Sequence, residues 1–412
     1  MTRKPLRILY AAGPGDVIGT YRHWKEGRDD PSEVAVTYSG QFFDVCRELG
    51  AEAWVISYHP RREKLRDGPF VVEHRQVRFM KGPGPLYILG QVWYGLRLVA
   101  SALRFRADVV VAMSGMAWFT LALLPVFGVK VVPTLHATFW RVTHPPRGFN
   151  RFLWNLNRRF FSCRVAAVMC VSDAVADQLK GLTGPLDVPV LRFAPTYRRG
   201  LFDGVADAPP GEPPPFRVFY AGRIERNKGV FDLLAVAERF KGEGRAGIEF
   251  DLCGSGGALE ELRQRVADAG LADTFRCHGH VQKQAMREMY RWAHVVVVPT
   301  TSEFVEGLNK VVVEAVLAAR PVITSPMCPA LEYVRGAVLE VPPDDVDAYA
   351  RAILRLADDH ALYDEKRRAC ADASPQFYEP QRGWGETFKR ILRTTGAVLE
   401  RGVAEVREPL PS

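Results

Sequence analysis

Two glutamates in the second half of the chain are spaced to hold the two ends of an extended ligand. Glu306 and Glu314 have seven residues between them and lie between two apolar, strand-like segments, residues 294–298 and 321–324. If this span were all helix, the carboxylates would be about 12 Å apart along its axis. That is roughly the reach from the ribose of a nucleotide to a sugar beyond its diphosphate. The alternative is that Glu306 only favours a helix N-terminus and Glu314 is a solvated helix residue.

Glycines and cations follow the expected strand 216–220. Residues 221–229 read AGRIERNKG, so Arg223 and Lys228 place two positive charges at the carboxyl end of that strand. Lys228 immediately precedes a helix, and the dipole at a helix N-terminus disfavours a cation. A cation in this unfavourable position indicates a functional purpose, namely that Lys228 and the helix dipole together bind a diphosphate. The alternative is a turn with exposed basic residues. The glycine-rich loop 253–257 can also approach a ligand closely, but a plain turn explains it equally well.

Alternating strands and helices must position these loops. The chain has 412 residues, too many for one ordinary core, and both halves alternate between the two element types. We therefore expect an α/β protein with two Rossmann-like, doubly wound domains that face a central cleft. The expected divisions are a first domain at 1–204, a proline-rich linker at 205–215, a second domain at 216–375 and a C-terminal helical segment at 376–412 that packs back on the first domain.

The first half contains a long gap between predicted elements. About 26 residues separate the strand 6–12 from the helix that begins near Ser39, and loops of this length are often functional. Tyr21, Arg22 and Gly40 are candidate acceptor contacts here. An insertion without a function explains the long loop equally well. His136 leaves the end of the strand 129–133, where ligands of open α/β sheets bind. We also expect an apolar helix at 116–126 and a helix rich in aromatics and arginine at 149–164.

Composition and charge bear on the cellular compartment of the protein and on the kind of partner it binds. Seven scattered cysteines without a CxxC pattern favour a reducing compartment and argue against a disulfide frame or structural zinc. Arg3 and Lys4 precede a strand, so we expect no signal peptide, and no apolar run reaches 18 residues. Residues 1–200 carry a net charge of +13 and the remainder −5. The basic half suggests an anionic partner, and by charge alone nucleic acid, an anionic membrane surface and a phosphorylated acceptor all qualify.

Five segments in order resemble retaining glycosyltransferases of family four, which have the GT-B fold. They are AGRIERNKG, CGSGG, RCHGHV, VVVPTTSEFVEG and the Glu306-to-Glu314 spacing followed by EAVLAARPVIT, and together they extend over about 170 residues. The resemblance implies a nucleoside diphosphate sugar as co-substrate and no cofactor. It also implies catalytic roles for Arg223, Lys228, Glu306 and His136, with the two cations stabilising the departing diphosphate.

The same resemblance implies the donor contacts. Glu314 would hydrogen-bond the ribose, the turn at His280 and Val281 would lie against the base, and the backbone after Glu306 would hold the sugar and distal phosphate. The full set of donor-binding residues implied is Gly222, Gly254, Gly256, His280, Val281, Gly307, Leu308, Asn309, Lys310 and Glu314. The family usually has Gly-Phe-Gly after the first glutamate, whereas this chain has Gly307-Leu308-Asn309. Asn309 can still adopt unusual backbone angles.

The expected reaction is glycosyl transfer to an acceptor hydroxyl with retention at the anomeric carbon, in polysaccharide or glycolipid assembly. The first domain, 1–204, would be the acceptor side and the second, 216–375, would bind the nucleotide sugar. The acceptor would be a carbohydrate or a polyprenyl-diphosphate-linked sugar, at a cytoplasmic site that is peripheral to the inner membrane face. Such a sugar or an anionic membrane surface is then preferred to nucleic acid as the partner of the basic half. Asp345 and Asp347 stand at a helix start and not between strands, so we expect no metal. The alternatives are a nucleotide-sugar epimerase or phosphorylase on the same fold, or a catalytically dead nucleotide-sugar-binding protein.

Overall fold

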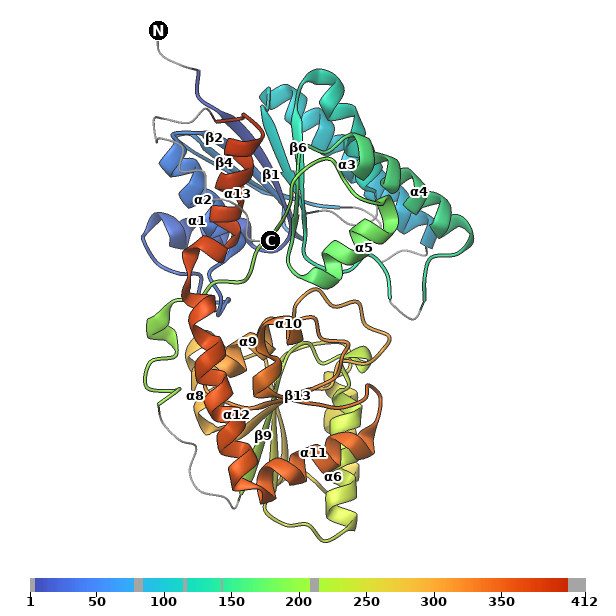
Figure 1. Cartoon of the computed structure of the whole chain (residues 1–412), viewed down its shortest axis with the longest axis vertical. Coiled ribbons are helices and arrows are strands. Elements are labelled where there is room, and N and C mark those ends of the chain that lie inside the picture. Colours follow the sequence, from blue (N-terminus) through green and yellow to red (C-terminus); the bar gives the residue numbers. More distant parts are fainter. Residues whose placement is uncertain (1–3, 78–83, 114–116, 142–143, 208–214, 399–412) are drawn as a thin grey trace, which may run out of the picture.

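Two α/β domains are stacked end to end, each with a mainly parallel sheet flanked by helices (Figure 1). The computed structural model describes residues 4–77, 84–113, 117–141, 144–207 and 215–398. Some strands are short β-branched runs that are buried throughout, such as the all-valine strand β12 at Val295–Val298. Continuous apolar strands of this kind belong to parallel sheets covered on both faces.

The first domain has an eight-stranded sheet in the order β3-β4-β2-β1-β5-β6-β7-β8, parallel except for the β3–β4 pair. Its strands are β1 Arg7–Pro14, β2 Glu52–Tyr58, β3 Glu63–Asp67, β4 Phe70–Arg75, β5 Val109–Ala112, β6 Lys130–Leu135, β7 Val168–Cys170 and β8 Val190–Arg192. Its helices are α1 Val17–Lys25, α2 Tyr38–Leu49, α3 Gly84–Phe105, the 3₁₀ helix η1 Trp118–Phe127, α4 Gly148–Cys163 and α5 Asp173–Thr183.

The second domain has a six-stranded parallel sheet in the order β11-β10-β9-β12-β13-β14. Its strands are β9 Phe216–Ala221, β10 Ile248–Cys253, β11 Phe275–Gly279, β12, β13 Val322–Thr324 and β14 Val338–Glu340. Its helices are η3 Arg226–Lys228, α6 Val230–Gly242, α7 Leu259–Asp268, α8 Lys283–Trp292, α9 Lys310–Leu317, α10 Leu331–Val334, α11 Val346–Asp358 and α12 His360–Ala373. In both sheets the strand order reverses beside the first strand, and ligands of open α/β sheets bind at such points.

The end of the described chain returns to the first domain. After α12 covers the second domain, α13 (Trp384–Thr394) packs against α2, as the red helix in Figure 1 shows. Trp384 is fully buried, with its ring 5.4 Å from that of Tyr10 and 5.3 Å from that of Phe388. The expected helical segment therefore crosses back, but the crossing α-helix begins at Trp384, and residues 399–412 of the prediction lie outside the described residues.

Four local predictions differ from the structure. The expected loop of about 26 residues contains α1, which Asp16 caps by accepting a hydrogen bond from the Gly19 N–H at 2.7 Å. The expected helix at 116–126 is a 3₁₀ helix, η1 at Trp118–Phe127, with Pro125 near its end, and residue 116 lies outside the described residues. The β3–β4 hairpin and α12 were not expected, because they present alternating or mainly polar residues with little burial.

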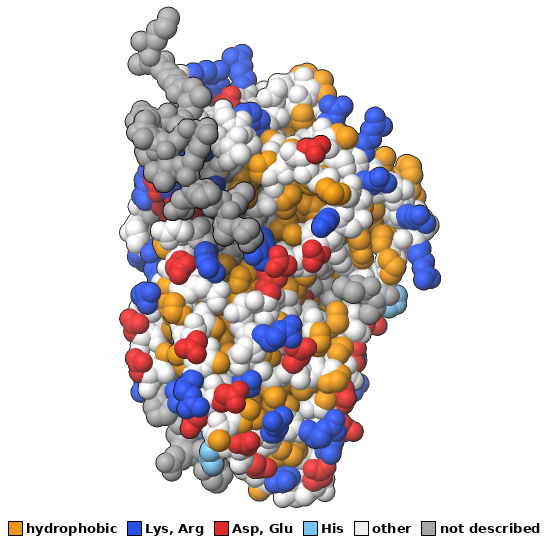
Figure 2. Space-filling model, viewed as in Figure 1, with side chains coloured by type: hydrophobic (Ala, Val, Ile, Leu, Met, Phe, Trp, Pro, Cys, Tyr) orange, Lys and Arg blue, Asp and Glu red, His pale blue; other side chains and the backbone are white. Residues whose placement is uncertain are grey.

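Helix α3 is apolar on the outside of the first domain. Among the described residues, it is the one helix long and apolar enough to cross a membrane by length and composition, which corrects the expectation that no apolar stretch reaches 18 residues. Because 44% of its most apolar window is buried inside the domain, α3 is part of the fold. Figure 2 shows apolar side chains at the surface of this upper domain, interspersed with Lys and Arg.

Candidate functional site

A cavity of about 490 Å³ lies between the two domains. It is bordered by segments that follow β1 and β6 in the first domain and β9 and β12 in the second. Eight predicted site residues line it: His136, Gly222, Arg223, Lys228, Glu306, Leu308, Asn309 and Lys310. The structure therefore brings all four predicted catalytic residues to one cavity.

A buried ion pair forms the centre of the second-domain wall. Lys228 Nζ donates to Glu306 Oε2 at 2.7 Å, and the two side chains are only 13% and 14% exposed. This burial excludes the alternative of an exposed basic turn for Lys228. Burial also lowers the pKa of Lys228, and the carboxylate of Glu306 opposes that shift. Glu306 thus holds a cation in a position where desolvation alone would favour its neutral form.

Phe304 joins the two predicted cations. Its ring centroid lies 3.5 Å from Lys228 Nζ and 5.4 Å from the guanidinium carbon of Arg223. A ring face attracts cations through its quadrupole, so Phe304 places both charges beside the cavity without neutralising them. The sequence analysis missed this residue. Its signal was an aromatic in the short loop between β12 and the first of the two glutamates.

The loop after Glu306 leads into the N-terminus of α9. Asn309 has a φ of 68°, in the left-handed region, and its amide Nδ2 lies 3.4 Å from Glu306 Oε2. The unusual backbone angle predicted for Asn309 is therefore present. Helix α9 begins immediately afterwards at Lys310, beside the cavity. Unpaired N–H groups at a helix N-terminus favour an anion there.

Glu314 occupies a different environment from Glu306. It is 6% exposed, it does not line the cavity, and its carboxylate accepts hydrogen bonds from Tyr290 at 2.9 Å and Tyr197 at 3.5 Å. Burial raises the pKa of Glu314 to about 7, against the lowering effect of the tyrosine hydroxyl. The alternative of a solvated helix residue is wrong for Glu314. Its contact with a ribose remains a prediction, since here its oxygens bind tyrosines.

His136 reaches the cavity from the end of β6. Its Nε2 lies 2.9 Å from Thr134 Oγ1, and the ring packs against Tyr38 and Phe193. The indole N–H of Trp384 donates to Thr134 Oγ1 at 2.9 Å, so the threonine proton is free to point at His136 Nε2. Burial, followed by the charge of Lys310, lowers the pKa of His136 to about 3. The imidazole is therefore neutral near pH 7.

Gly307 brings the two domains into contact beside this histidine. A Cβ at Gly307 would lie 1.9 Å from the backbone oxygen of His136. The Gly307 oxygen accepts a hydrogen bond from Ser172 at 2.8 Å, and the Glu306 oxygen accepts one from Thr138 at 3.3 Å. Gly307 itself does not line the cavity. Its lack of a side chain lets the loop of Glu306 reach the first domain.

The remaining predicted donor contacts lie outside the cavity. A Cβ at Gly254 would be 1.7 Å from the Gly222 oxygen, and one at Gly256 would be 2.2 Å from the Ile224 oxygen. These two glycines therefore let one loop pack on another. His280 is exposed and Val281 is partly buried, and both follow β11 at the edge of the second sheet. Neither residue lines the cavity, and their contact with a base stays a prediction.

The three predicted acceptor contacts are placed differently from the expectation. Tyr21 is 2% exposed and donates to Asp67 at 3.1 Å, while Arg22 points outward and pairs with Glu63 at 2.7 Å. Neither lines the cavity, because α1 turns these two side chains away from it. The face of α1 that does border the cavity carries Val17 and Thr20.

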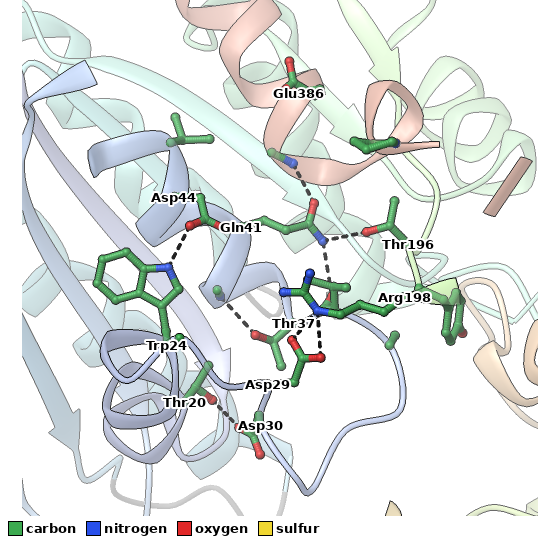
Figure 3. Close-up of a pocket in the computed structure, with 18 of the residues that line it drawn as sticks. Thr20, Trp24, Asp29, Asp30, Thr37, Gln41, Asp44, Thr196, Arg198 and Glu386 are labelled. Carbon is green, nitrogen blue, oxygen red and sulfur yellow. Dashed lines mark hydrogen bonds and ion pairs between the residues drawn. The ribbon is translucent and has the colours of Figure 1, made fainter. Parts of the chain in front are cut away.

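Gly40 lines a second, polar cavity of about 790 Å³ (Figure 3). This cavity lies where the chain passes between the domains, and it shares Thr20, Asp30 and Thr37 with the first. Ion pairs and hydrogen bonds cross it, including Asp29 to Arg198 at 2.8 Å. The two cavities therefore meet at the C-terminal side of α1.

Two facing α/β domains with a cavity between them and a returning C-terminal helix define the GT-B class of glycosyltransferases. The family model described as "Glycosyl transferases group 1" matches residues 208–377, and the one described as "Glycosyltransferase Family 4" matches residues 36–191. Together they cover most of the chain. The protein belongs to glycosyltransferase family four.

Individual relatives agree with this assignment. The 2-deoxystreptamine N-acetyl-D-glucosaminyltransferase of Streptomyces fradiae is 28% identical over 312 residues, which are 67% of this chain and 72% of that protein. Among solved structures, α,α-trehalose 6-phosphate synthase from Burkholderia multivorans has a TM-score of 0.72 at 14% identity, with 96% of this chain and 99% of that chain covered. Anabaena HepE in complex with UDP-glucose has a TM-score of 0.64 at 17% identity, with 95% and 100% covered. The structural likenesses establish the fold.

Proposed function

We propose that this protein transfers a hexosyl group from a nucleoside diphosphate sugar to an acceptor hydroxyl, with retention of anomeric configuration. The observation that carries the proposal is the Lys228–Glu306 pair beside Arg223, which meets the start of α9 in the interdomain cavity. Two cations and a helix N-terminus converge where a diphosphate would gain negative charge as it leaves. The UDP-glucose complex of HepE, a protein of the same fold, supports such a donor in this class.

The proposed chemistry uses a front-face route. Glu306 is engaged by Lys228 and Asn309, so its carboxylate is better suited to positioning the cation and the donor sugar than to attacking the anomeric carbon. The departing phosphate would take the acceptor proton, while Arg223 and Lys228 stabilise its charge. Neutral His136 would hydrogen-bond a sugar hydroxyl. No metal takes part in this proposal, and turnover should persist in excess EDTA.

The acceptor would bind between the first domain and the donor. Asp30 and Thr37 border both cavities, so an acceptor longer than one sugar would extend from the first cavity into the polar second one. A carbohydrate, free or linked to a polyprenyl diphosphate, has the hydroxyl groups that these polar residues would bind. The acceptor would be presented at an anionic membrane surface, given the basic first half of the chain.

Ligand binding and labelled-donor assays test this proposal. A thermal-shift panel of uridine and guanosine diphosphates and their sugars should identify one donor that raises Tm. With that donor labelled, product NMR should show transfer to an added glycan with the donor's anomeric configuration. Conversion of the donor without any acceptor would assign an epimerase, and donor binding without turnover on a broad acceptor panel would assign a binding protein. A panel in which no nucleotide raises Tm would contradict the proposed function.

A further inference from the structure

Helix α3 is apolar on both of its sides. Its buried side holds Tyr94, Leu98, Val99 and Ala102 together with Gly90, Gln91, Gly95 and Ser101. Its outer side carries large apolar residues at helical spacing: Leu86, Leu89, Trp93 and Leu96, which are 40%, 57%, 58% and 41% exposed. A helix on a water-exposed surface places such residues inward. This stripe extends for about 15 Å along the helix.

Two neighbouring elements continue the apolar surface. In η1, Leu123, Val126 and Phe127 are 49%, 65% and 63% exposed, and in α4, Phe149 and Phe152 are 62% and 55% exposed. These three elements contain all but one of the exposed large apolar residues in the part of the chain that the structure describes, and the exception is Val190 on β8. Apolar surface gathered in this way marks an interaction site more strongly than the same residues scattered singly.

The three elements form one face. Contacts join α3 to η1 and η1 to α4, and the N–H of Phe119 in η1 donates to Asn157 of α4 at 3.0 Å. Right-handed crossovers into β5, β6 and β7 place all three on the side of the sheet opposite α1 and α2. We call this outward surface the α3–η1–α4 face.

All charges on these elements have the same sign. Together α3, η1 and α4 contain five arginines and no aspartate or glutamate: Arg97, Arg104, Arg151, Arg158 and Arg159. The last three are exposed, and none of the five forms an ion pair with a described residue. Arg97 and Arg104 line a cavity together with Glu63 and Glu73, so the arginines that border the apolar surface are the three of α4. An apolar surface bordered by arginines is complementary to apolar lipid tails beneath anionic headgroups.

We propose that the α3–η1–α4 face docks this protein on the surface of an anionic lipid bilayer. The apolar stripe would enter the boundary between headgroups and acyl chains, and the arginines would contact the headgroups. Because the other side of α3 is part of the domain core, the helix would lie along the membrane and not cross it. A second copy of this chain is a poorer occupant, since joining two such faces would bring the arginines of α4 in one copy close to those in the other.

This inference rests on the proposed function in one respect, that the acceptor is presented at the membrane. Lipid binding itself can be measured without donor or acceptor. The experiment is co-sedimentation of the full chain with vesicles of phosphatidylcholine alone or with a quarter phosphatidylglycerol. We expect at least about tenfold tighter binding to the anionic vesicles, weakened by high salt. Equal binding to both vesicles, or binding to neither, would overturn the proposal.

Paired variants locate the surface. Leu89→Glu with Trp93→Glu, and separately Arg158→Glu with Arg159→Glu, should each weaken binding about tenfold or more. Their matched controls are Val190→Glu, the exposed apolar residue outside the face, and Arg245→Glu, an exposed arginine on the second domain. The controls should bind vesicles like the unaltered chain.

Two further measurements make each result decisive. Each variant should keep the far-UV spectrum and the nucleotide-induced rise in Tm of the unaltered chain, which shows that it is folded and has an intact donor site. If the face variants bind vesicles normally, the proposal is wrong. If light scattering without lipid shows that they break a dimer of the unaltered chain, the face belongs to a second copy and the proposal is also wrong. Absence of a nucleotide response in the unaltered chain counts against the proposed function alone.

Discussion

At the residue scale, the site depends on keeping a lysine charged in a poorly hydrated position. Burial lowers the pKa of Lys228, whereas Glu306 at 2.7 Å and the face of Phe304 both favour its ammonium form. The same ammonium faces the cavity in which a diphosphate would develop charge. Glu306 would thus maintain the charge of the empty site, and the ligand's phosphate would compete for the same cation.

Removing either member of this pair should lower both turnover and stability. We expect Lys228→Ala and Glu306→Ala to lower kcat by about 10²–10³, as loss of one charge-stabilising donor does in other enzymes. Because the pair is buried, each variant leaves the other charge without its counter-ion, and the free energy of unfolding should fall by about 3–5 kcal/mol. Steady-state kinetics and urea denaturation measure the two effects.

Matched controls exist within the same two loops. Arg226 lies in the same 3₁₀ turn as Lys228 but pairs with Glu261 at the surface, and Glu303 is exposed in the loop of Glu306. Arg226→Ala and Glu303→Ala should keep kcat within about twofold. Near-normal turnover of Lys228→Ala or Glu306→Ala would contradict the proposed roles of the pair.

Glu314 should make stability depend on pH. Burial raises its pKa from the usual value near 4.5 to about 7, so the folded state binds the proton more tightly than the unfolded state. Stability from this group is then complete below about pH 4.5 and is lost as pH rises to about 7. Glu314→Gln cannot lose a proton. Relative to the unaltered chain it should therefore gain on the order of 1–3 kcal/mol between pH 5 and pH 8.

Urea denaturation at the two pH values measures this difference. The exposed Glu303→Gln serves as the control and should show the same pH dependence as the unaltered chain. A Glu314→Gln difference that is equal at pH 5 and pH 8 would show that the carboxyl group titrates normally in the folded protein.

At the scale of elements, α13 fixes the end of β6 through one hydrogen bond. Trp384 and Thr134 are both fully buried, and the threonine also contacts His136. Thr134→Val would leave the indole N–H without a partner and should cost about 1–3 kcal/mol of unfolding free energy. In Thr134→Val/Trp384→Phe both partners are apolar, so the double variant should cost less than the sum of the two single variants.

The same variants test a positioning role for Thr134 in catalysis. Thr134→Val removes the hydroxyl that orients His136, so kcat should fall several-fold while the nucleotide-induced Tm shift stays unchanged. Thr134→Ser keeps the hydroxyl and should restore kcat. If Thr134→Ser and Thr134→Val have equal kcat, the hydroxyl has only a structural role.

Sequence patterns predict elements whose burial is uniform and miss elements whose burial is mixed. The valine-rich strands β5 and β12 were predictable because every residue is buried. In contrast, α12 buries only Cys370 of fourteen residues, and β3 buries none of five. Their positions depend on contacts with other elements, which a local pattern does not contain.

The candidate site follows the same division. Arg223, Lys228 and Glu306 were predictable because they stand in loops at strand ends, where the topology of a parallel sheet gathers ligand-binding residues. The burial of Glu314 against Tyr290 and Tyr197 was not, since the partners come from α8 and from the segment that joins the domains. The orientation of Tyr21 depended on α1, which its mixed sequence VIGTYRHWK did not indicate.

At the scale of the whole molecule, the two domains touch where the chemistry would occur. The loop of Glu306 reaches Ser172 and Thr138 of the first domain, and Lys310 pairs with Glu33 across the cavity at 3.2 Å. These contacts lie within a few residues of Glu306, which pairs with Lys228. The distance between donor-side and acceptor-side groups is therefore set by how closely the loop can approach the backbone at His136.

Gly307→Ala should separate the domains without removing any polar group. Its Cβ would meet the backbone oxygen of His136 at 1.9 Å, and a backbone atom cannot rotate away as a side chain can, so the loop or the domain must move. We expect a larger radius of gyration by small-angle scattering and a kcat at least about tenfold lower, because a displacement near 1 Å at reacting groups costs that much or more. Nucleotide binding, which needs only the second domain, should persist. Gly257→Ala is the matched control, since the nearest atom to its Cβ would be a carboxylate oxygen of Glu225 at 3.6 Å. If Gly307→Ala turns over like Gly257→Ala, close approach of this loop to the first domain does not limit the reaction.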